Sequence, residues 1–216
     1  MAKNVENRTN IFSFIPKSVS SEAFLVWLIN YLDSDKKYSQ CKQALFDNLL
    51  LKIEDKGKSV SEIVVNCQEN DMEVVLSFHF NGTDEKHDIL LLFGDKASNM
   101  IRLEQLDRYK RFYPNCYRYI YYKVGYVTSI EEQCVSRNLY ELITDGMMES
   151  VLETMEDLHP LIKMYTDYLN SEGDAVNAYY ESIFLKHEKD VLQEPAAQKY
   201  LLDSVLECNY DNFWNI

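Results

Sequence analysis

The stretch FGDKASNMIRLEQLDRYKRFY, residues 93–113, contains the change from strand to helix on which the fold prediction depends. It follows directly from the apolar run DILLLF, residues 88–93, which does not alternate and so predicts a strand covered on both faces. Lys96 stands just past this strand, and a helix bearing Gln105 and Tyr109 follows it. These two residues are four apart and share one helix face, so a polar site is expected at this edge of the sheet.

Period-two hydrophobic patterns predict the other strands of the sheet. The four expected strands cover residues 61–67, 72–80, 87–95 and 117–124. The pair Asn81-Gly82 is typical of a hairpin turn between the second and the third of them. Because a helix separates the last two strands, the order predicts a three-layer α/β/α fold with a central mixed sheet of about four or more strands.

Helical patterns precede and follow these strands. We expect Ser20–Glu22 to cap a first helix with the sequence AFLVWLINYL, and a second helix over residues 39–53. A helix is expected at residues 99–113, between the third and the fourth strand. After the sheet, helices are expected at residues 131–144, 146–157, 160–170, 174–187 and 197–208. The chain is expected to be a single domain, residues 1–216, with a core at about 10–127 and a helical cap at about 128–216.

Composition limits the possible partners and the location. The net charge of −13 argues against a protein that coats nucleic acid nonspecifically, so any contact with DNA must be local. The sequence contains no apolar run of membrane-spanning length and no signal peptide, which predicts a cytoplasmic protein without a membrane partner. One local concentration of basic residues comprises Arg102, Arg108, Lys110, Arg111, Arg118 and Lys123.

Cysteine and histidine usage does not indicate a metal site or a disulfide framework. The five cysteines are odd in number, widely spaced and never arranged as C-x-x-C, so buried free thiols are expected. The four histidines are equally scattered. His159, directly before Pro160, is interpreted as a helix boundary rather than a ligand.

Four segments together resemble the PD-(D/E)xK nuclease superfamily, and most closely its uncharacterised bacterial branch. They are the strand-end Lys96, the helix segment QLDRY, the strand YIYYKVGY, and the opening pair NIFSF and SSEAFLVWL. The resemblance covers about residues 10–127, with a weaker similarity in HPLIKMYTDYL at 159–169. It implies a restriction-endonuclease-like core.

The chemistry of phosphodiester hydrolysis explains the residue types of such a site. A divalent ion polarises the phosphoryl oxygen and lowers the pKa of the attacking water, and Mg²⁺ prefers carboxylate and water oxygens. Two or three acids must therefore converge. A neighbouring lysine can hold the nucleophilic water or offset the charge that develops in the transition state.

The resemblance implies roles for particular residues of this chain. The acid of the first helix falls on Glu22, and the acid of the middle strand falls on Glu73, where the family usually has aspartate. Asp71 is the alternative ligand, since residues two apart on a strand point to one face. The family lysine falls on Lys96. The substrate-binding residues implied are Gln105, Tyr109, Arg102 and Arg108.

Some of these residues also have a plain structural interpretation. Acids at the start of an exposed strand, such as Asp71 and Glu73, are usually only solvated. Tyr109 is as well explained by a half-buried core tyrosine as by a substrate contact. The basic concentration on the helix is typical of a solvated face.

Gly94 is the departure from the family pattern. The family carries glutamate or aspartate two residues before its lysine, and a glycine can supply no ligand. Asp95 is adjacent, but on a regular strand it points to the opposite face unless a bulge at Gly94 turns it inward. The metal ligands that remain are Glu22, Glu73, Asp71 and Asp95.

Two functions follow from these residues. The first is a DNA endonuclease or exonuclease that depends on Mg²⁺ or Mn²⁺, with Lys96 at the nucleophile, acting in phage or mobile-element conflict. The second is an inactive nuclease-fold protein that binds DNA or a protein partner. Mimicry of DNA by the acidic surface is a third possibility, but no motif supports it.

The nuclease interpretation also predicts a geometry. Glu22, Glu73 and Lys96 should share one cleft with Gln105 on its wall, and Gly94→Glu should restore a metal ligand.

Overall fold

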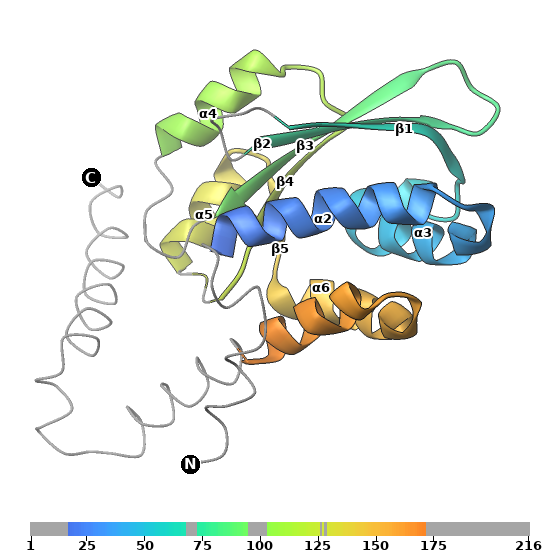
Figure 1. The fold of residues 1–216 in the computed structure, drawn as a ribbon. Coiled ribbons are helices and arrows are strands. Elements are labelled where there is room, and N and C mark those ends of the chain that lie inside the picture. Colours follow the sequence, from blue (N-terminus) through green and yellow to red (C-terminus); the bar gives the residue numbers. More distant parts are fainter. Residues whose placement is uncertain (1–16, 68–72, 95–102, 126, 128, 172–216) are drawn as a thin grey trace, which may run out of the picture.

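The computed structural model describes residues 17–67, 73–94, 103–125, 127 and 129–171. These residues form an α/β fold with one mixed five-stranded sheet, and helices lie on both of its faces (Figure 1). The strands, in the order in which they pair, are β1 Val60–Cys67, β2 Glu73–Phe80, β3 Lys86–Gly94, β4 Arg118–Lys123 and β5 Glu141–Ile143. The predicted mixed sheet and all four predicted strands are confirmed.

Pairing within the sheet changes direction at β3. The strands β1, β2 and β3 pair antiparallel, whereas β3, β4 and β5 pair parallel. The turn at Asn81-Gly82 joins β2 to β3 as predicted: Gly82 has a φ of 84°, and the amide of Thr83 donates to the carbonyl of Phe80 at 3.1 Å. Positive φ at this position explains the glycine.

The fifth strand was not predicted. Residues 131–144 were expected to be one helix, but α5 ends at Arg137 and β5 begins at Glu141. Leu139 has a φ of 60°, and the amide of Tyr140 donates to the carbonyl of Val135, so the helix closes in a tight turn. A strand of three residues is too short to show a period of two in the sequence.

The helices match the predicted segments in part. Their bounds are α2 Lys17–Asp33, α3 Ser39–Leu45, α4 Leu103–Phe112, α5 Ser129–Arg137 and α6 Asp145–Leu152, with helical backbone again over 160–171. The expected cap at Ser20–Glu22 is wrong, because the chain is already helical from Lys17. The predicted helix 160–170 is confirmed, whereas 174–187 and 197–208 lie outside the described residues.

Two predicted helices are shorter than expected. The helix predicted over 39–53 continues past α3 as a π-helical turn, Phe46–Leu50, and stops at Leu51, whose backbone is extended. The helix predicted over 146–157 is α6 followed by a 3-10 segment, Glu153–Leu158. His159 then marks the boundary as predicted, since its Nδ1 accepts from the amide of Leu161 at 3.1 Å.

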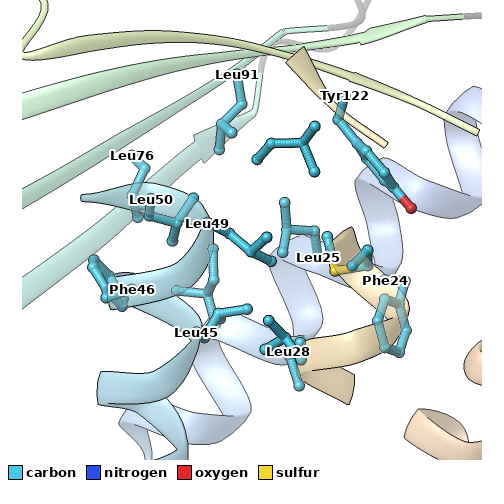
Figure 2. Close-up of a cluster of buried hydrophobic side chains, with 14 of the residues drawn as sticks. Phe24, Leu25, Leu28, Leu45, Phe46, Leu49, Leu50, Leu76, Leu91 and Tyr122 are labelled. Carbon is cyan, nitrogen blue, oxygen red and sulfur yellow. The ribbon is translucent and has the colours of Figure 1, made fainter. Parts of the chain in front are cut away.

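One face of the sheet, which we call the α2 face, carries the main hydrophobic core. Figure 2 shows its centre, where side chains from α2, α3 and the π-helical turn meet the sheet. The labelled residues are Phe24, Leu25, Leu28, Leu45, Phe46, Leu49, Leu50, Leu76, Leu91 and Tyr122. Each fully buried leucine of this kind stabilises the fold by about 2 kcal/mol.

The opposite face, which we call the α4 face, has a smaller core that is rich in tyrosine. Its buried apolar residues are Leu90, Leu92, Leu106, Tyr109, Tyr121, Val135 and Tyr140. Because side chains alternate along a strand, Glu73 and Lys123 point to this face beside Leu92 and Tyr121. The helices α4 and α5 both contribute to it, since each connects neighbouring parallel strands.

The strand β1 forms one edge of the sheet and is irregular. Its pairing with β2 shifts between Ser61 and Val64, which is a β-bulge. Glu62, inside the bulge, has a φ of 51° and a side chain that is 79% exposed. The opposite edge is the three-residue strand β5.

Candidate functional site at the carboxyl ends of the parallel strands

Three residues singled out by the sequence meet at one end of the sheet. Gly94 ends β3, and its register partner is Lys123, which ends the parallel strand β4. Glu73 begins the antiparallel strand β2 and pairs with Leu92 of β3, so it lies at the same end. Open α/β sheets bind ligands beyond the carboxyl ends of their parallel strands, which makes this end the candidate site.

Glycine is required at position 94 because the side chain of Tyr121 occupies the space that a Cβ atom would take. A Cβ atom at this position would lie 2.0 Å from the hydroxyl oxygen of Tyr121 and 2.6 Å from its Cζ atom. Gly94 is not among the described glycines with positive φ, so its backbone conformation does not require glycine. An acidic side chain at this position would therefore have to displace Tyr121, which is almost fully buried.

The hydroxyl group over Gly94 belongs to a buried ionic cluster. Tyr121 donates to Oε1 of Glu131 at 3.0 Å, and the ammonium of Lys123 donates to the same oxygen at 2.6 Å and also to Oε2. The side chains of Lys123 and Glu131 are 3% and 1% exposed. The carboxylate charge at this end of the sheet is thus balanced by an internal ammonium group, which buried charges require.

The local chain path brings Glu131 to this position. Lys123 is the last residue of β4, and α5 begins six positions later at Ser129. Glu131 lies in the first turn of α5, where the helix dipole favours a negative charge. The connection from β4 to β5 therefore places the carboxylate of Glu131 at the carboxyl end of β4.

Glu73 lies on the same face but has different neighbours. Its side chain is buried, and its Oε1 accepts a hydrogen bond from the hydroxyl of Tyr113 at 3.0 Å. Burial, followed by nearby charges that include Glu73, raises the pKa of Tyr140 above its usual range. Glu73 is therefore a buried carboxylate among tyrosines, and the interpretation of a solvated acid on an exposed strand is wrong for it.

Glu22 belongs to a helix that packs on the other face of the sheet. Its helix α2 packs on the α2 face (Figure 1). The side chain of Glu73 points to the α4 face, because it alternates along β2 with Val74 of the α2 face. Partial burial raises the pKa of the Glu22 carboxyl. Its neighbour Ser21 accepts a hydrogen bond from Tyr165 at 2.8 Å, and Tyr165 bonds Tyr122 at 3.1 Å, which fixes this end of α2 against the sheet. The convergence of Glu22 with Glu73 stays a prediction.

The remaining predicted residues are placed in part. Lys96, Asp71, Asp95 and Arg102 lie outside the described residues. Gln105 lies in α4, of which only the backbone is described at that position. Tyr109 is buried in the tyrosine-rich core, so a core role accounts for it. Arg108 is exposed, with its guanidinium carbon 5.1 Å from the centre of the Tyr109 ring.

The predicted basic cluster is largely used by the fold. Lys110 donates to a backbone carbonyl of the α5–β5 turn, and Arg118 donates to two carbonyls and pairs with a glutamate of β5. Lys123 is buried in the ionic cluster. Among the described members of the cluster, Arg108 and Arg111 remain as cations on the surface.

The described residues do not fit a Mg²⁺ site. Within the described ranges, no group of three or more acidic, histidine or cysteine side chains is close enough to hold a metal ion. Gly94 offers no oxygen ligand from a side chain, and Glu131 is already neutralised by Lys123. Since Mg²⁺ requires converging carboxylates, Glu73 would need Asp71 or Asp95 to complete a site.

Sequence reasoning missed Tyr121 and Glu131. Tyr121 falls within a tyrosine-rich strand, YRYIYYKV, in which nothing distinguishes one ring from the next. Glu131 was treated as an ordinary first residue of a predicted helix. The available signal was an acid in the first turn of a helix that follows a strand-end lysine, because this spacing lets the two charges meet.

Comparison of the chain with protein-family models, with curated proteins and with solved structures gives no match. Nor does any helix within the described part of the chain have the length and apolar character needed to cross a membrane.

Proposed function

We propose that this chain is a nuclease-fold protein without metal-dependent cleavage, which binds DNA or a protein partner. The single observation that carries this proposal is the contact between Gly94 and Tyr121, because the hydroxyl of Tyr121 fills the space of the missing acid. The fold proposed with it is the three-layer α/β/α arrangement of a restriction-endonuclease-like core. The resemblance in sequence and the mixed α/β fold support this assignment.

The buried ion pair supports the loss of chemistry independently of Gly94. A carboxylate that accepts bonds from both Lys123 and Tyr121 has its charge balanced, so it has little to gain from a divalent ion. The internal ion pair satisfies the buried charges at the strand ends without any cofactor. The fold does not by itself require catalysis, which is compatible with a binding function.

The test is cleavage by the unmodified protein. Supercoiled plasmid, linear duplex and single-stranded DNA are incubated with the chain in the presence of Mn²⁺ and then of Mg²⁺. We expect no cleavage, together with measurable binding of DNA or of a protein partner. The matched controls are Lys96→Ala and Glu73→Gln, which remove the two strongest candidates for chemistry.

Metal-dependent cleavage that disappears in both control variants would contradict the proposal. In that case Asp95 or Asp71 replaces the acid missing at Gly94, and the enzyme hypothesis holds. Cleavage that persists in both variants would indicate a contaminating nuclease, and the preparation would be repeated.

A further inference from the structure

The outer side of α4 carries a surface groove of about 470 Å³ with an aromatic and two cationic side chains. Among the described residues, Asp107, Arg108, Arg111 and Phe112 line it, and we call these four the α4 surface. Arg108, Arg111 and Phe112 are three and four positions apart, so they lie on one side of the helix. The other side of α4 packs Leu106 and Tyr109 against the sheet.

Phe112 is exposed without a packing role that accounts for it. Its side chain is 70% exposed at the end of α4. A large ring in water costs free energy that burial would recover. An exposed ring beside a groove is the feature that stacking on a flat ligand requires.

The charge of the α4 surface differs from that of the chain. The chain carries −13, whereas this surface presents two guanidinium groups, with Asp107 paired to Arg111. Remote acids have little effect on a ligand bound here, because at 0.1 M salt charges are screened beyond about 10 Å. The local field at the groove is therefore suited to an anion.

We propose that the α4 surface binds single-stranded nucleic acid, with a base on the ring of Phe112 and phosphates at Arg108 and Arg111. Aromatic rings combined with cationic side chains are the common elements of single-strand binding, because every base has a face that can stack. In a duplex the base faces are already stacked on each other and cannot reach the ring. The inference rests on the proposed function, and it names the partner.

A hydrogen bond links the end of α4 to the candidate site. Tyr113, which follows Phe112 directly, accepts a hydrogen bond from Tyr119 at its carbonyl, so the end of α4 lies over the amino half of β4. The hydroxyl of Tyr113 reaches from there to Glu73.

Fluorescence anisotropy with a short labelled oligothymidylate tests the proposal. We expect Phe112→Ala to weaken binding roughly fivefold or more, as the loss of one stacked base does, and Phe112→Trp to retain binding. The matched control is Ile53→Ala, an equally simple truncation of an apolar side chain that is 84% exposed. We expect the control to bind within about twofold of the unmodified protein, the level at which a shift is below about 0.4 kcal/mol.

The dependence of oligonucleotide affinity on salt concentration tests the two arginines. Its slope would not change if Arg108 and Arg111 had only a structural role. Arg108→Gln and Arg111→Gln should each lower the slope of log affinity against log salt concentration by about 0.7, the value for one phosphate contact of a single strand. Lys163→Gln is the control, since Lys163 is an exposed cation near Asp167 four positions away, as Arg111 is near Asp107. Asp107→Asn should tighten binding, because it removes the negative charge beside Arg111.

Four results would overturn the proposal. They are absence of binding by the unmodified chain, a loss in Phe112→Ala no larger than in Ile53→Ala, tighter binding of duplex than of single strand, and equal competition by polyglutamate. The last would assign the surface to an acidic protein. These four results concern binding and say nothing about cleavage. Conversely, cleavage of DNA by the unmodified chain would contradict the proposed loss of activity but not binding at the α4 surface. The two proposals can therefore fail separately.

Discussion

The two faces of the sheet are built on different principles. The α2 face is a continuous core in which leucine, isoleucine and phenylalanine from several helices fill the space against the strands. The α4 face is smaller, contains several tyrosines, and holds the buried ionisable side chains of Glu73, Lys123 and Glu131. Apolar packing tolerates exchange of similar side chains, whereas a buried charge requires its particular partner.

This difference indicates which face of the sheet carries the residues that bear on function. The buried charges of the α4 face stand at the carboxyl ends of β3 and β4, together with Gly94. The α2 face stabilises the domain, and the end of the α4 face carries the contact between Gly94 and Tyr121 and the buried ion pair on which the proposed function rests. Four variants test this contrast.

The largest effect is expected for Lys123→Met. This change leaves the carboxylate of Glu131 buried without its ammonium, which should lower the free energy of unfolding by about 3–5 kcal/mol. Urea denaturation followed by circular dichroism measures it. The double variant Lys123→Met/Glu131→Gln should recover most of the loss, because it removes both charges and keeps an acceptor for Tyr121. A stable single variant would show that the pair is not essential.

Gly94→Ala should be the next most damaging. The added methyl group meets the hydroxyl of Tyr121, so we expect a loss of about 1–3 kcal/mol in the free energy of unfolding. Combining it with Tyr121→Phe should cost less than the sum of the two single changes, since the shorter ring relieves the contact. A neutral Gly94→Ala would mean that Tyr121 moves aside easily, and the proposed function would lose its main support.

Introducing methionine on the α2 face, instead of at Lys123, should change the free energy of unfolding only slightly. Leu91→Met is a nearly volume-conserving change in an apolar core, and we expect it to cost less than about 1.5 kcal/mol. The contrast with Lys123→Met then isolates the effect of charge, because the introduced residue is identical. Equal losses at the two positions would remove the distinction between the faces.

The smallest effect is expected at the rim of the α2 face, where Asp55 meets Tyr117. Hydrogen bonds from Lys58 and then Tyr117 lower the pKa of Asp55. Because the folded pKa lies below the unfolded one, the stabilisation is present above the usual aspartate pKa and is lost as pH falls below about 4. Asp55→Asn should therefore be less stable than the unmodified chain at pH 7, with the difference shrinking toward acidic pH in urea titrations. A difference independent of pH would contradict the assignment.

The parts of the fold that leave a local pattern in the sequence were predicted correctly. The four longer strands and the hairpin at Asn81-Gly82 are confirmed, because alternation and positive φ leave local signals. The three-residue β5 and the π-helical end of α3 were missed, since tertiary packing determines both. Gly94 was recognised as unusual from the sequence, but its cause, the hydroxyl of Tyr121, lies on the neighbouring strand. The partner of Lys123 depends on the path of α5, which no local pattern contains.

The irregular edge strand has a consequence for the behaviour of the protein at high concentration. A regular edge offers unpaired amides and carbonyls to any extended chain, and growth of cross-β aggregates begins in this way. In β1 the bulge at Ser61–Val64 interrupts that template, and Glu62 places a solvated negative charge within it. The opposite edge is only three residues long. Sheet-to-sheet polymerisation is therefore disfavoured at both edges by backbone geometry as well as by the net negative charge.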